Sequence, residues 1–452
     1  MRQSAFILRT IVIGLVGLLA ALWYGAARLM IFGSTDLDED KRVARLRGRV
    51  LRWICETLGA TFIKLGQVMS SRPDLFPPEM IAELKLLQDQ LPAFAGARGI
   101  IERELGRPIE ELFSEFDEEP IAAASVAQVH HGVLEDGTEV AVKVLRPDVR
   151  ARAEGDAEIL LFFARTLMRL DGRAEHAELE GHLRHFVDGI LEQTDLRIEA
   201  ANYEKFRKNF KRVKKVRFPK VFPELSGERV MTMEFVRGEK ISASLKDRFP
   251  DLASRLREVF LKMCFDDGLL HADLHPGNFL VAADGTITIF DVGLTKELGE
   301  ELLVHYIDFN RCLVMGNVND FMTHLRRFHS YVEGTVDWAE LEADMVRFNE
   351  EYRQRSAAQL EFGDLINRIF SVGRKHGVRP VPDMTLMMVG LITAEGIGKM
   401  LDPDVNSFQE VSNYLIPVLA RRNMLSDSLM QAAAAMSERT MQVAALEPSA
   451  AV

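Results

Sequence analysis

The chain has 452 residues, of which 27% are charged and 47% are hydrophobic, and its net charge is -11. This length allows two lobes of an enzyme with extensions, and the composition excludes a largely disordered chain. The negative charge argues against nucleic acid as the main partner. The cysteines are scattered and form no CxxC pair, which favours a reduced, cytosol-facing compartment over a disulfide-stabilised secreted fold.

The first segment is strongly apolar: residues 10–27 carry no charge, and apolar residues extend this run on both sides. It is long enough to cross a bilayer, and Trp23 and Tyr24 are typical of a membrane interface. A cleaved signal peptide is the alternative, but the apolar core is long and no small-residue cleavage site follows it. We therefore expect a retained, single-pass N-terminal membrane anchor.

The next segment is helical in pattern and contains the sequence Lys64-Leu-Gly-Gln67. A basic stretch, residues 41–52, begins it, and its charges would contact anionic headgroups or simply face solvent. Lys64 and Gln67 lie three residues apart, on one face of an otherwise apolar helix. Ordinary amphipathic packing accounts for such a pair. A regulatory role for Lys64 and Gln67 is the functional alternative.

A β-rich stretch begins at Pro120 and runs to His130, and a turn then leads to a strand, residues 139–145, that contains Val-Ala-Val-Lys143. In protein kinases a lysine at this position pairs with the α- and β-phosphates and with a helix glutamate. Lys143 on an apolar strand needs a partner, because a buried unpaired lysine is costly. Where kinases have a glycine-rich phosphate loop, this chain has an alanine-rich one, which still allows backbone N–H groups to approach phosphates. The residues of this loop are Ala122, Ala123, Ala124 and Ser125.

Residues 191–202 have a pattern that predicts one helix with Glu192, Asp195 and Glu199 on the same face, because their spacings are three and four. We expect Glu199 to be the partner of Lys143.

A later run, residues 230–236, predicts an apolar strand that leads to Gly238. It suits the hinge of a kinase, whose backbone hydrogen-bonds adenine. This assignment makes Glu234 and Val236 nucleotide-binding residues.

The strongest functional signal lies in residues 268–294. Asp273 is followed five residues later by Asn278, and Asp291 follows a predicted strand–turn–strand. Phosphoryl transfer needs an acidic residue to orient the attacking hydroxyl or water, and oxygen ligands that hold Mg²⁺ against the phosphates. The order and spacing are those of the catalytic loop and DFG element of protein kinases. We predict that Asp273 and Lys143 are catalytic and that Asn278 and Asp291 bind Mg²⁺; a His/Asp metal cluster without nucleotide is the alternative.

Over roughly residues 58–406 the chain resembles the UbiB/AarF family of atypical protein-kinase-like ATPases. The resemblance rests on KxGQ at Lys64, the alanine-rich loop, the VAVK lysine Lys143 and the sequence HADLHPGN ending at Asn278. It implies an α+β, two-lobed kinase-like fold with an N-terminal helical extension that covers the active site. It also implies binding of ATP with Mg²⁺, ATPase activity, and support of ubiquinone or other prenyl-lipid biosynthesis at membranes. Because ATP is inside, the kinase-like part would lie on the cytoplasmic or matrix side.

Five segments are expected along the chain. They are a membrane anchor (1–35), a helical KxGQ-containing extension (36–118), a kinase-like N-lobe (119–240), a kinase-like C-lobe (241–425) and a tail (426–452). The C-lobe is helical in pattern, and its apolar stretch 384–391 is expected in the core rather than against a quinone.

Two positions depart from the expected pattern: Val292 stands where kinases have Phe, and Gln193 stands at an acidic position of the family's ExD motif. No APE element follows Gly293, and the implied extension would block a peptide substrate, so protein phosphorylation in trans is not expected.

The expected function is an ATPase. A small-molecule or lipid kinase and a non-catalytic ATP-binding scaffold are the alternatives. The expected partners are a membrane lipid or prenyl-quinone intermediate and a quinone-biosynthesis complex, with no nucleic acid.

Overall fold

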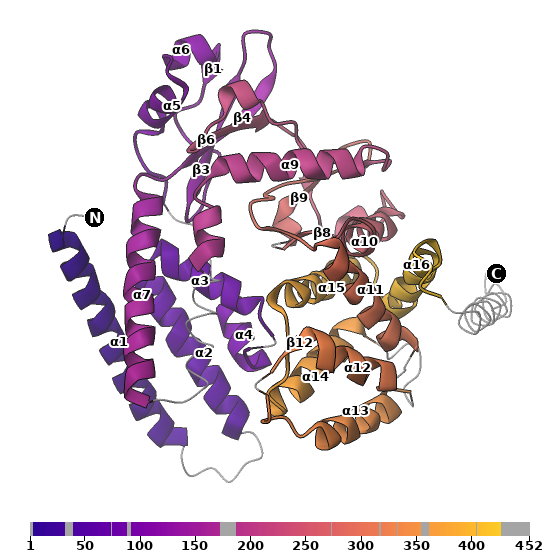
Figure 1. Ribbon diagram of the computed structural model, residues 1–452. Coiled ribbons are helices and arrows are strands. Elements are labelled where there is room, and N and C mark those ends of the chain that lie inside the picture. Colours follow the sequence, from indigo (N-terminus) through magenta and orange to yellow (C-terminus); the bar gives the residue numbers. More distant parts are fainter. Residues whose placement is uncertain are drawn as a thin grey trace. The chain divides into compact units, whose positions relative to one another are not determined.

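The computed structural model describes residues 3–31, 39–73, 75–87, 92–171, 187–272, 274–315, 318–331, 333–353, 361–403 and 405–425. The chain forms two compact units (Figure 1), the first of Met1–Leu245 and His271–Thr295, the second of Lys246–Leu270 and Lys296–Val452. As predicted, the fold mixes helices and sheets.

A layer of helices begins the first unit. Its members are α1 (Gln3–Ile31), α2 (Glu39–Leu58), α3 (Ala60–Ser70), α4 (Pro78–Leu84) and α7 (Val149–Asp171). Figure 1 shows α1 running alongside α2 and α7. Apolar side chains from α1, α2, α3 and α7 share one core, which includes Ile13, Cys55, Phe62 and Ile159. The KxGQ helix α3 is therefore packed among other helices rather than free.

Helix α1 is long and apolar enough to cross a membrane over Phe6–Leu29. One face of α1 packs into the first unit, where the Arg9 guanidinium lies 2.7 Å from the Asp156 carboxylate and donates to the Leu58 carbonyl at 2.8 Å. The other face exposes large aliphatic side chains, among them Leu8, Leu15 and Leu22. This apolar face is what a membrane-associated helix would present to lipid.

A five-stranded antiparallel sheet follows the helical layer. Its strands are β1 (Glu115–Phe116), β2 (Ala122–Ala123), β3 (Ala127–Val133), β4 (Glu139–Leu145) and β6 (Val230–Glu234). The predicted β-rich stretch to His130 is confirmed as β2 and β3, which are joined by a turn that Ala124 N–H closes on the Ala127 carbonyl at 2.8 Å. Val140, Val142 and Val144 of β4 pack in one core with α5 (Ala97–Leu105) and α6 (Ile109–Leu112). Since side chains alternate along a strand, Lys143 points to the opposite face of the sheet.

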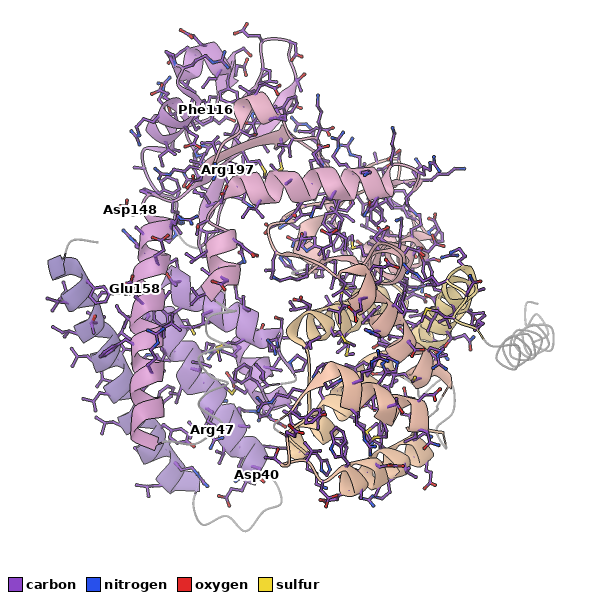
Figure 2. All side chains as sticks on the ribbon, in the orientation of Figure 1. Asp40, Arg47, Phe116, Asp148, Glu158 and Arg197 are labelled. Carbon is purple, nitrogen blue, oxygen red and sulfur yellow. The ribbon has the colours of Figure 1, made fainter. Side chains whose placement is uncertain are left out.

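Helix α9 (Leu196–Phe210) begins later than the sequence pattern predicts. Residues 187–192 are helical, but Asp195 has an extended backbone and its carboxylate accepts a hydrogen bond from Arg197 N–H at 3.0 Å. Aspartate is a preferred N-cap because its side chain satisfies a free N–H group of the first turn. Figure 2 labels Arg197 at this end of α9. The prediction that Glu192, Asp195 and Glu199 share one helical face is therefore wrong.

A second sheet of four strands has the order β5 (Val216–Arg217), β10 (Ile287–Ile289), β9 (Phe279–Val281) and β7 (Glu239–Lys240). The predicted strand–turn–strand is confirmed, because β9 and β10 pair antiparallel. In the turn, the Asp284 carboxylate accepts a hydrogen bond from Thr286 N–H at 2.9 Å. Three short 3₁₀ segments complete the unit: η1 (Pro223–Leu225), η2 (Ala243–Leu245) and η4 (Pro276–Asn278).

The described part of the second unit is mainly helical. Its helices are α10 (Leu252–Leu261), η3 (Lys262–Asp267, a π-helix), α11 (Glu300–Met315), α12 (Val318–Phe328), α13 (Trp338–Arg353), α14 (Phe362–Lys375), α15 (Pro382–Leu401) and α16 (Ser407–Arg421). Strands β12 (His329–Ser330) and β13 (Arg379–Pro380) pair within it, and β8 (Leu269–His271) and β11 (Thr295–Glu297) stand where the chain passes between the units.

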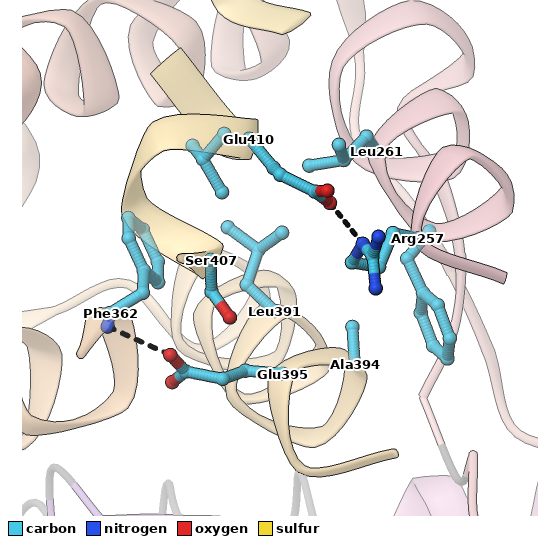
Figure 3. Close-up of a pocket in the computed structure, with 10 residues that line it drawn as sticks. Arg257, Leu261, Phe362, Leu391, Ala394, Glu395, Ser407 and Glu410 are labelled. Atoms are coloured by element: carbon cyan, nitrogen blue, oxygen red, sulfur yellow. Dashed lines mark hydrogen bonds and ion pairs between the residues drawn. The ribbon is translucent and has the colours of Figure 1, made fainter. Parts of the chain in front are cut away.

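Helix α15 also meets the length and composition of a membrane span, over Asp383–Leu401, but most of this span is buried within the protein. Met384, Met387 and Met388 are fully buried, which confirms the prediction that this stretch is core. A cavity of about 30 Å³ lies beside α15, and Figure 3 shows Arg257, Glu395 and Glu410 among its lining residues. A cavity of this size has room for roughly one or two water molecules, so it would not hold a nucleotide or a quinone.

Candidate nucleotide site

A buried ion pair joins β4 to α9. Lys143 Nζ lies 2.8 Å and 2.9 Å from the two carboxylate oxygens of Glu199. The strand alternation turns Lys143 away from the valine core, and Glu199 lies in the first turn of α9, where an acidic side chain complements the helix dipole. The predicted pairing of Lys143 with Glu199 is confirmed.

Asp291 enters the same cluster from the end of β10. Its Oδ1 lies 3.2 Å from Lys143 Nζ, so one lysine contacts two carboxylates. Asp291 has φ 55°, a left-handed conformation uncommon outside glycine, and such strained residues gather at functional sites. The Asp291 N–H donates to the Tyr203 hydroxyl at 3.0 Å, and the Asn202 amide donates to the Val292 carbonyl at 3.0 Å. Helix α9 therefore holds the segment at Asp291 by two further contacts.

Asn202 and Tyr203 are positioning residues that the sequence analysis missed. They lie three and four residues after Glu199, so they share its face of α9. Tyr203 is fully buried, and burial raises the pKa of its hydroxyl, which stays protonated. The helical spacing from Glu199 was the signal that would have identified both.

The two residues that follow Asp291 suit this packing. Val292 is fully buried, so it keeps the packing role predicted for the position where kinases have Phe. A Cβ on Gly293 would lie 3.3 Å from Glu199 Oε2 and 3.6 Å from Asp291 Oδ1. Glycine at this position leaves space for the two carboxylates.

The β9–β10 hairpin brings Asn278 and Asp291 to the same end of the second sheet. The Phe290 N–H donates to the Asn278 carbonyl at 2.9 Å, so the residue before Asp291 is bonded to Asn278 directly. His271 Nε2 lies 2.8 Å from the carbonyl of the same Phe290. Asp273 lies outside the described residues, and its catalytic role stays a prediction.

The charges of this cluster act strongly on one another. Lys143 lowers the pKa of the Asp291 carboxyl well below its ordinary value, with Lys64 and His271 acting in the same direction against burial. Burial raises the pKa of Glu199, against the attraction of Lys143 and Lys64. Burial would lower the pKa of Lys143, but Asp291 and Glu199 outweigh it, and the pKa of Lys143 is raised. At neutral pH, Lys143 is therefore charged and Asp291 is ionised.

Helix α3 contributes Lys64 to this electrostatic environment. Lys64 is only 6% exposed, and its charge acts on both Asp291 and Glu199. A Cβ on Gly66 would lie 2.4 Å from Leu87, so glycine permits the close approach of α3 to its neighbours. The Gln67 Oε1 atom is buried and has no hydrogen-bond partner in the described part of the chain. Lys64 is thus buried and acts electrostatically on Asp291, and its placement over the cleft stays a prediction.

The alanine-rich loop lies at the β2–β3 connection. Ala122 is exposed, Ala123 and Ala124 are half-buried, and Ser125 is fully buried. The Ala124 carbonyl accepts a hydrogen bond from Arg146 Nε at 2.8 Å, which fixes the loop to the end of β4. A phosphate-binding role for Ala122, Ala123, Ala124 and Ser125 stays a prediction.

The predicted adenine-binding hinge follows β6. The Glu234 N–H donates to the Lys220 carbonyl at 2.8 Å, and the Phe235 N–H donates to the Glu139 carbonyl at 3.1 Å. The Glu234 carboxylate also accepts from Arg217 at 2.6 Å, a partner that the sequence did not predict. Val236 is half-buried. The nucleotide-binding roles of Glu234 and Val236 stay predictions.

Comparisons with known proteins give the family. The model of the ABC1 atypical kinase-like domain matches residues 86–325, and that of the UbiB helical domain matches residues 345–406. The chain is 33% identical over 392 residues to the "Probable protein kinase UbiB" of Aeromonas hydrophila, covering 83% of this chain and 71% of that relative. It is 32% identical over 380 residues to the protein of the same name from Pseudomonas putida, covering 82% of this chain and 70% of that relative.

A solved structure supports the fold. The chain is similar to "The complex structure of Rv3197-erythromycin from Mycobacterium tuberculosis", with a TM-score of 0.53 and 24% identity. The similarity covers 78% of this chain and 92% of that one, and at this identity it bears on the fold alone. The predicted atypical kinase-like fold is confirmed, and the chain belongs to the UbiB family of ABC1 atypical kinase-like proteins.

Proposed function

We propose that this protein is a Mg²⁺-dependent ATPase that supports ubiquinone or related prenyl-lipid biosynthesis at a membrane. The observation that carries the proposal is the contact of Lys143 with both Glu199 and Asp291, at 2.8 Å and 3.2 Å. In kinases the lysine–glutamate pair and the metal-binding aspartate must both be in place for phosphoryl transfer. The test is ATP turnover by the purified protein with and without Mg²⁺.

The donor set fits ATP with Mg²⁺. The Asp291 side chain is ionised and 48% exposed, and carboxylate and amide oxygens are the ligands that Mg²⁺ takes in proteins. Asp291 and Asn278 would hold Mg²⁺, and Lys143 would bind the α- and β-phosphates. Bound Mg²⁺ supplies positive charge against the phosphate oxygens. Asp273 would orient the attacking water.

The burial and charge of Lys64 on helix α3 support the proposal that water is the phosphoryl acceptor. Lys64 is buried and its charge acts on Asp291 and Glu199, so the extension would contribute to the proposed nucleotide site. In the proposed mechanism α3 covers the site, excludes peptides and leaves space for water. The charge of Lys64, which acts on Asp291, would also oppose binding of Mg²⁺ there, because like charges repel. Lys64 would therefore act as a brake on turnover.

A cavity of about 580 Å³ supports a link between the membrane anchor and this brake. Its walls come from α1, from the start of α3 and from the β4–α7 region, and include Leu8, Val12, Thr61, Arg146 and Arg152. Arg146 is the residue that also binds the carbonyl of Ala124 in the alanine-rich loop. The Asp156 carboxylate of the lining is paired with Arg9, so the aliphatic walls and the other cations suit a membrane lipid with an anionic headgroup. Such a lipid would change turnover if it bound one position of α3 better than another.

Replacing Lys64 by alanine should raise basal ATP turnover by roughly 10-fold, the equivalent of about 1.4 kcal/mol, because the opposing charge is removed. Lys64→Arg keeps the charge and is the matched control. Both variants are compared with the wild type by phosphate release in detergent solution. Equal turnover in Lys64→Ala and the wild type would show that Lys64 serves packing alone.

The anchor is tested in the same assay with anionic liposomes. Deleting residues 1–32 should abolish stimulation by liposomes and spare basal turnover. Because this deletion uncovers part of the core shared with α3, the point variant Arg152→Glu provides a milder test of the cavity. Arg150→Glu, exposed on the same helix and outside the cavity lining, is its control. Full stimulation of Arg152→Glu would remove the cavity from the proposal.

A further inference from the structure

Side chains of the types that bind transition metals gather between α11 and α12. Asp308 and Cys312 are four residues apart on α11, so they share one face, and His324 faces them from α12. One ligand atom from each of these three residues lies within 4.8 Å of the other two. Cys312 is 2% exposed and His324 7% exposed, so the cluster is shielded from solvent.

We propose that Asp308, Cys312 and His324 form a zinc site that joins α11 to α12. The donor atoms are a thiolate sulfur, an imidazole nitrogen and a carboxylate oxygen, the set that Zn²⁺ accepts in tetrahedral sites. As the sulfur–zinc bond forms, the thiol proton of Cys312 passes to solvent. The site lies wholly within the second unit and is independent of the nucleotide chemistry.

The Arg311 side chain contacts two of the proposed ligands, Asp308 and Cys312. Arg311 donates to Asp308 Oδ1 at 2.5 Å, whereas the other carboxylate oxygen, Oδ2, contacts His324 Nε2. Arg311 therefore balances the charge on Oδ1 and leaves Oδ2 facing His324. Residues that hydrogen-bond to a metal ligand commonly orient it in this way. The same guanidinium lies 3.5 Å from Cys312 Sγ and 3.2 Å from Asp320 Oδ2. Burial raises the pKa of the Cys312 thiol and Arg311 only partly opposes this, so the thiol would lose its proton on binding the metal.

With Zn²⁺ bound, the positive and negative charges of the cluster and its neighbours would be equal. The cation Arg311 would by itself disfavour a metal ion. Asp308, Asp320 and an ionised Cys312 carry three negative charges, which equal the sum of Arg311 and Zn²⁺.

Three protein ligands leave one tetrahedral position for water or for a further imidazole. His305 lies three residues before Asp308, on the same face of α11, and its ring centroid is 6.2 Å from that of His324. Three of the chain's eleven histidines, His305, His324 and His329, fall within this short part of the sequence. The Nδ1 atom of His329 is buried without a hydrogen-bond partner among the residues described here. Imidazoles are thus concentrated where the fourth ligand would be needed.

A second group of Glu340, Asp344 and His376 provides an internal contrast. Both carboxylate oxygens of Asp344 already face a lysine or arginine, since Oδ2 lies 2.6 Å from Lys375 and Oδ1 contacts Arg347, whereas in Asp308 only Oδ1 contacts an arginine. The group contains no cysteine. We therefore assign no metal to it and use it as a control.

The test uses the full-length protein, freed of metal by a chelator and then titrated with Zn²⁺ or Co²⁺. We expect one tightly bound ion per chain, and for Co²⁺ a thiolate-to-metal charge-transfer band. The band should disappear in Cys312→Ser and His324→Ala and remain in Cys264→Ser and His376→Ala. Oxygen ligands at Asp291 give no such band, which separates the two sites. Zinc should also raise the Tm of the wild type by about 3 °C or more, and that of Cys312→Ser much less.

A readout in the wild type covers the case in which the variants fold poorly. Zinc should protect Cys312 from alkylation under partly denaturing conditions, and leave Cys264 as reactive as before, as peptide mass analysis would show. Equal alkylation of Cys312 with and without zinc would overturn the proposal. A cobalt spectrum unchanged by Cys312→Ser would overturn it as well.

Discussion

Replacing Asp291 by asparagine should reduce Mg²⁺-dependent ATP affinity by about 100-fold or more. Loss even of groups behind a metal ligand costs about 10- to 100-fold in metal affinity, and Asp291 is predicted to be a direct ligand. The variant keeps the side-chain shape and the N–H that donates to Tyr203. The fold should therefore survive, and the loss would be one of charge.

The measurement is the thermal stabilisation of the protein by ATP with and without Mg²⁺. Asp284→Asn is the control, because Asp284 is an exposed aspartate of the same hairpin, in the turn. The pKa of Asp291 is depressed, so its carboxylate remains ionised, and wild-type binding should not weaken as pH falls towards the ordinary carboxyl range. Equal Mg²⁺-dependent stabilisation of Asp291→Asn and the wild type would show that Asp291 is not a metal ligand.

The second large effect is expected on stability. Lys143→Met removes the cation from a Glu199 side chain that is only 6% exposed. Removing one partner of a buried ion pair costs about 3–5 kcal/mol, because the other charge stays buried without compensation. We expect the free energy of unfolding at neutral pH to fall by roughly this amount, and ATP binding to be lost.

The control is the double variant Lys143→Met/Glu199→Leu. It removes both charges, and apolar replacements of a buried pair are often neutral. Denaturant unfolding should therefore show the double variant to be more stable than Lys143→Met alone, although neither binds ATP. A double variant less stable than the single one would mean that Glu199 has another important partner.

Much of the Lys143–Glu199–Asp291 cluster could be predicted because short sequence patterns identify its residues. Lys143 lies within a recognisable strand, and Asn278 and Asp291 flank a hairpin whose turn residues are explicit in the sequence. Pairing Lys143 with Glu199 required only that a lysine on an apolar strand find a carboxylate on the helix that follows. The membrane-length apolar segment and the core position of 384–391 followed from composition and periodicity.

Other features depend on tertiary contacts that a local pattern does not contain. The periodic helical pattern continues through Asp195, so the sequence alone does not show that Asp195 is an N-cap at which a new helix begins. Arg217 meets Glu234 from another sheet, and Asn202 and Tyr203 act on backbone groups nearly ninety residues away. His324 joins Asp308 and Cys312 only because α12 folds back on α11.

Following the γ-phosphate of ATP tests the proposed ATPase activity most directly. The full-length protein in anionic liposomes is given ATP with Mg²⁺, and ADP, free phosphate, lipids and protein are analysed by mass. We predict that free phosphate forms in step with ADP and that neither lipid nor protein gains phosphate. Phosphate on a lipid would contradict the ATPase and identify a lipid kinase, and ATP binding without ADP formation would identify a non-catalytic scaffold.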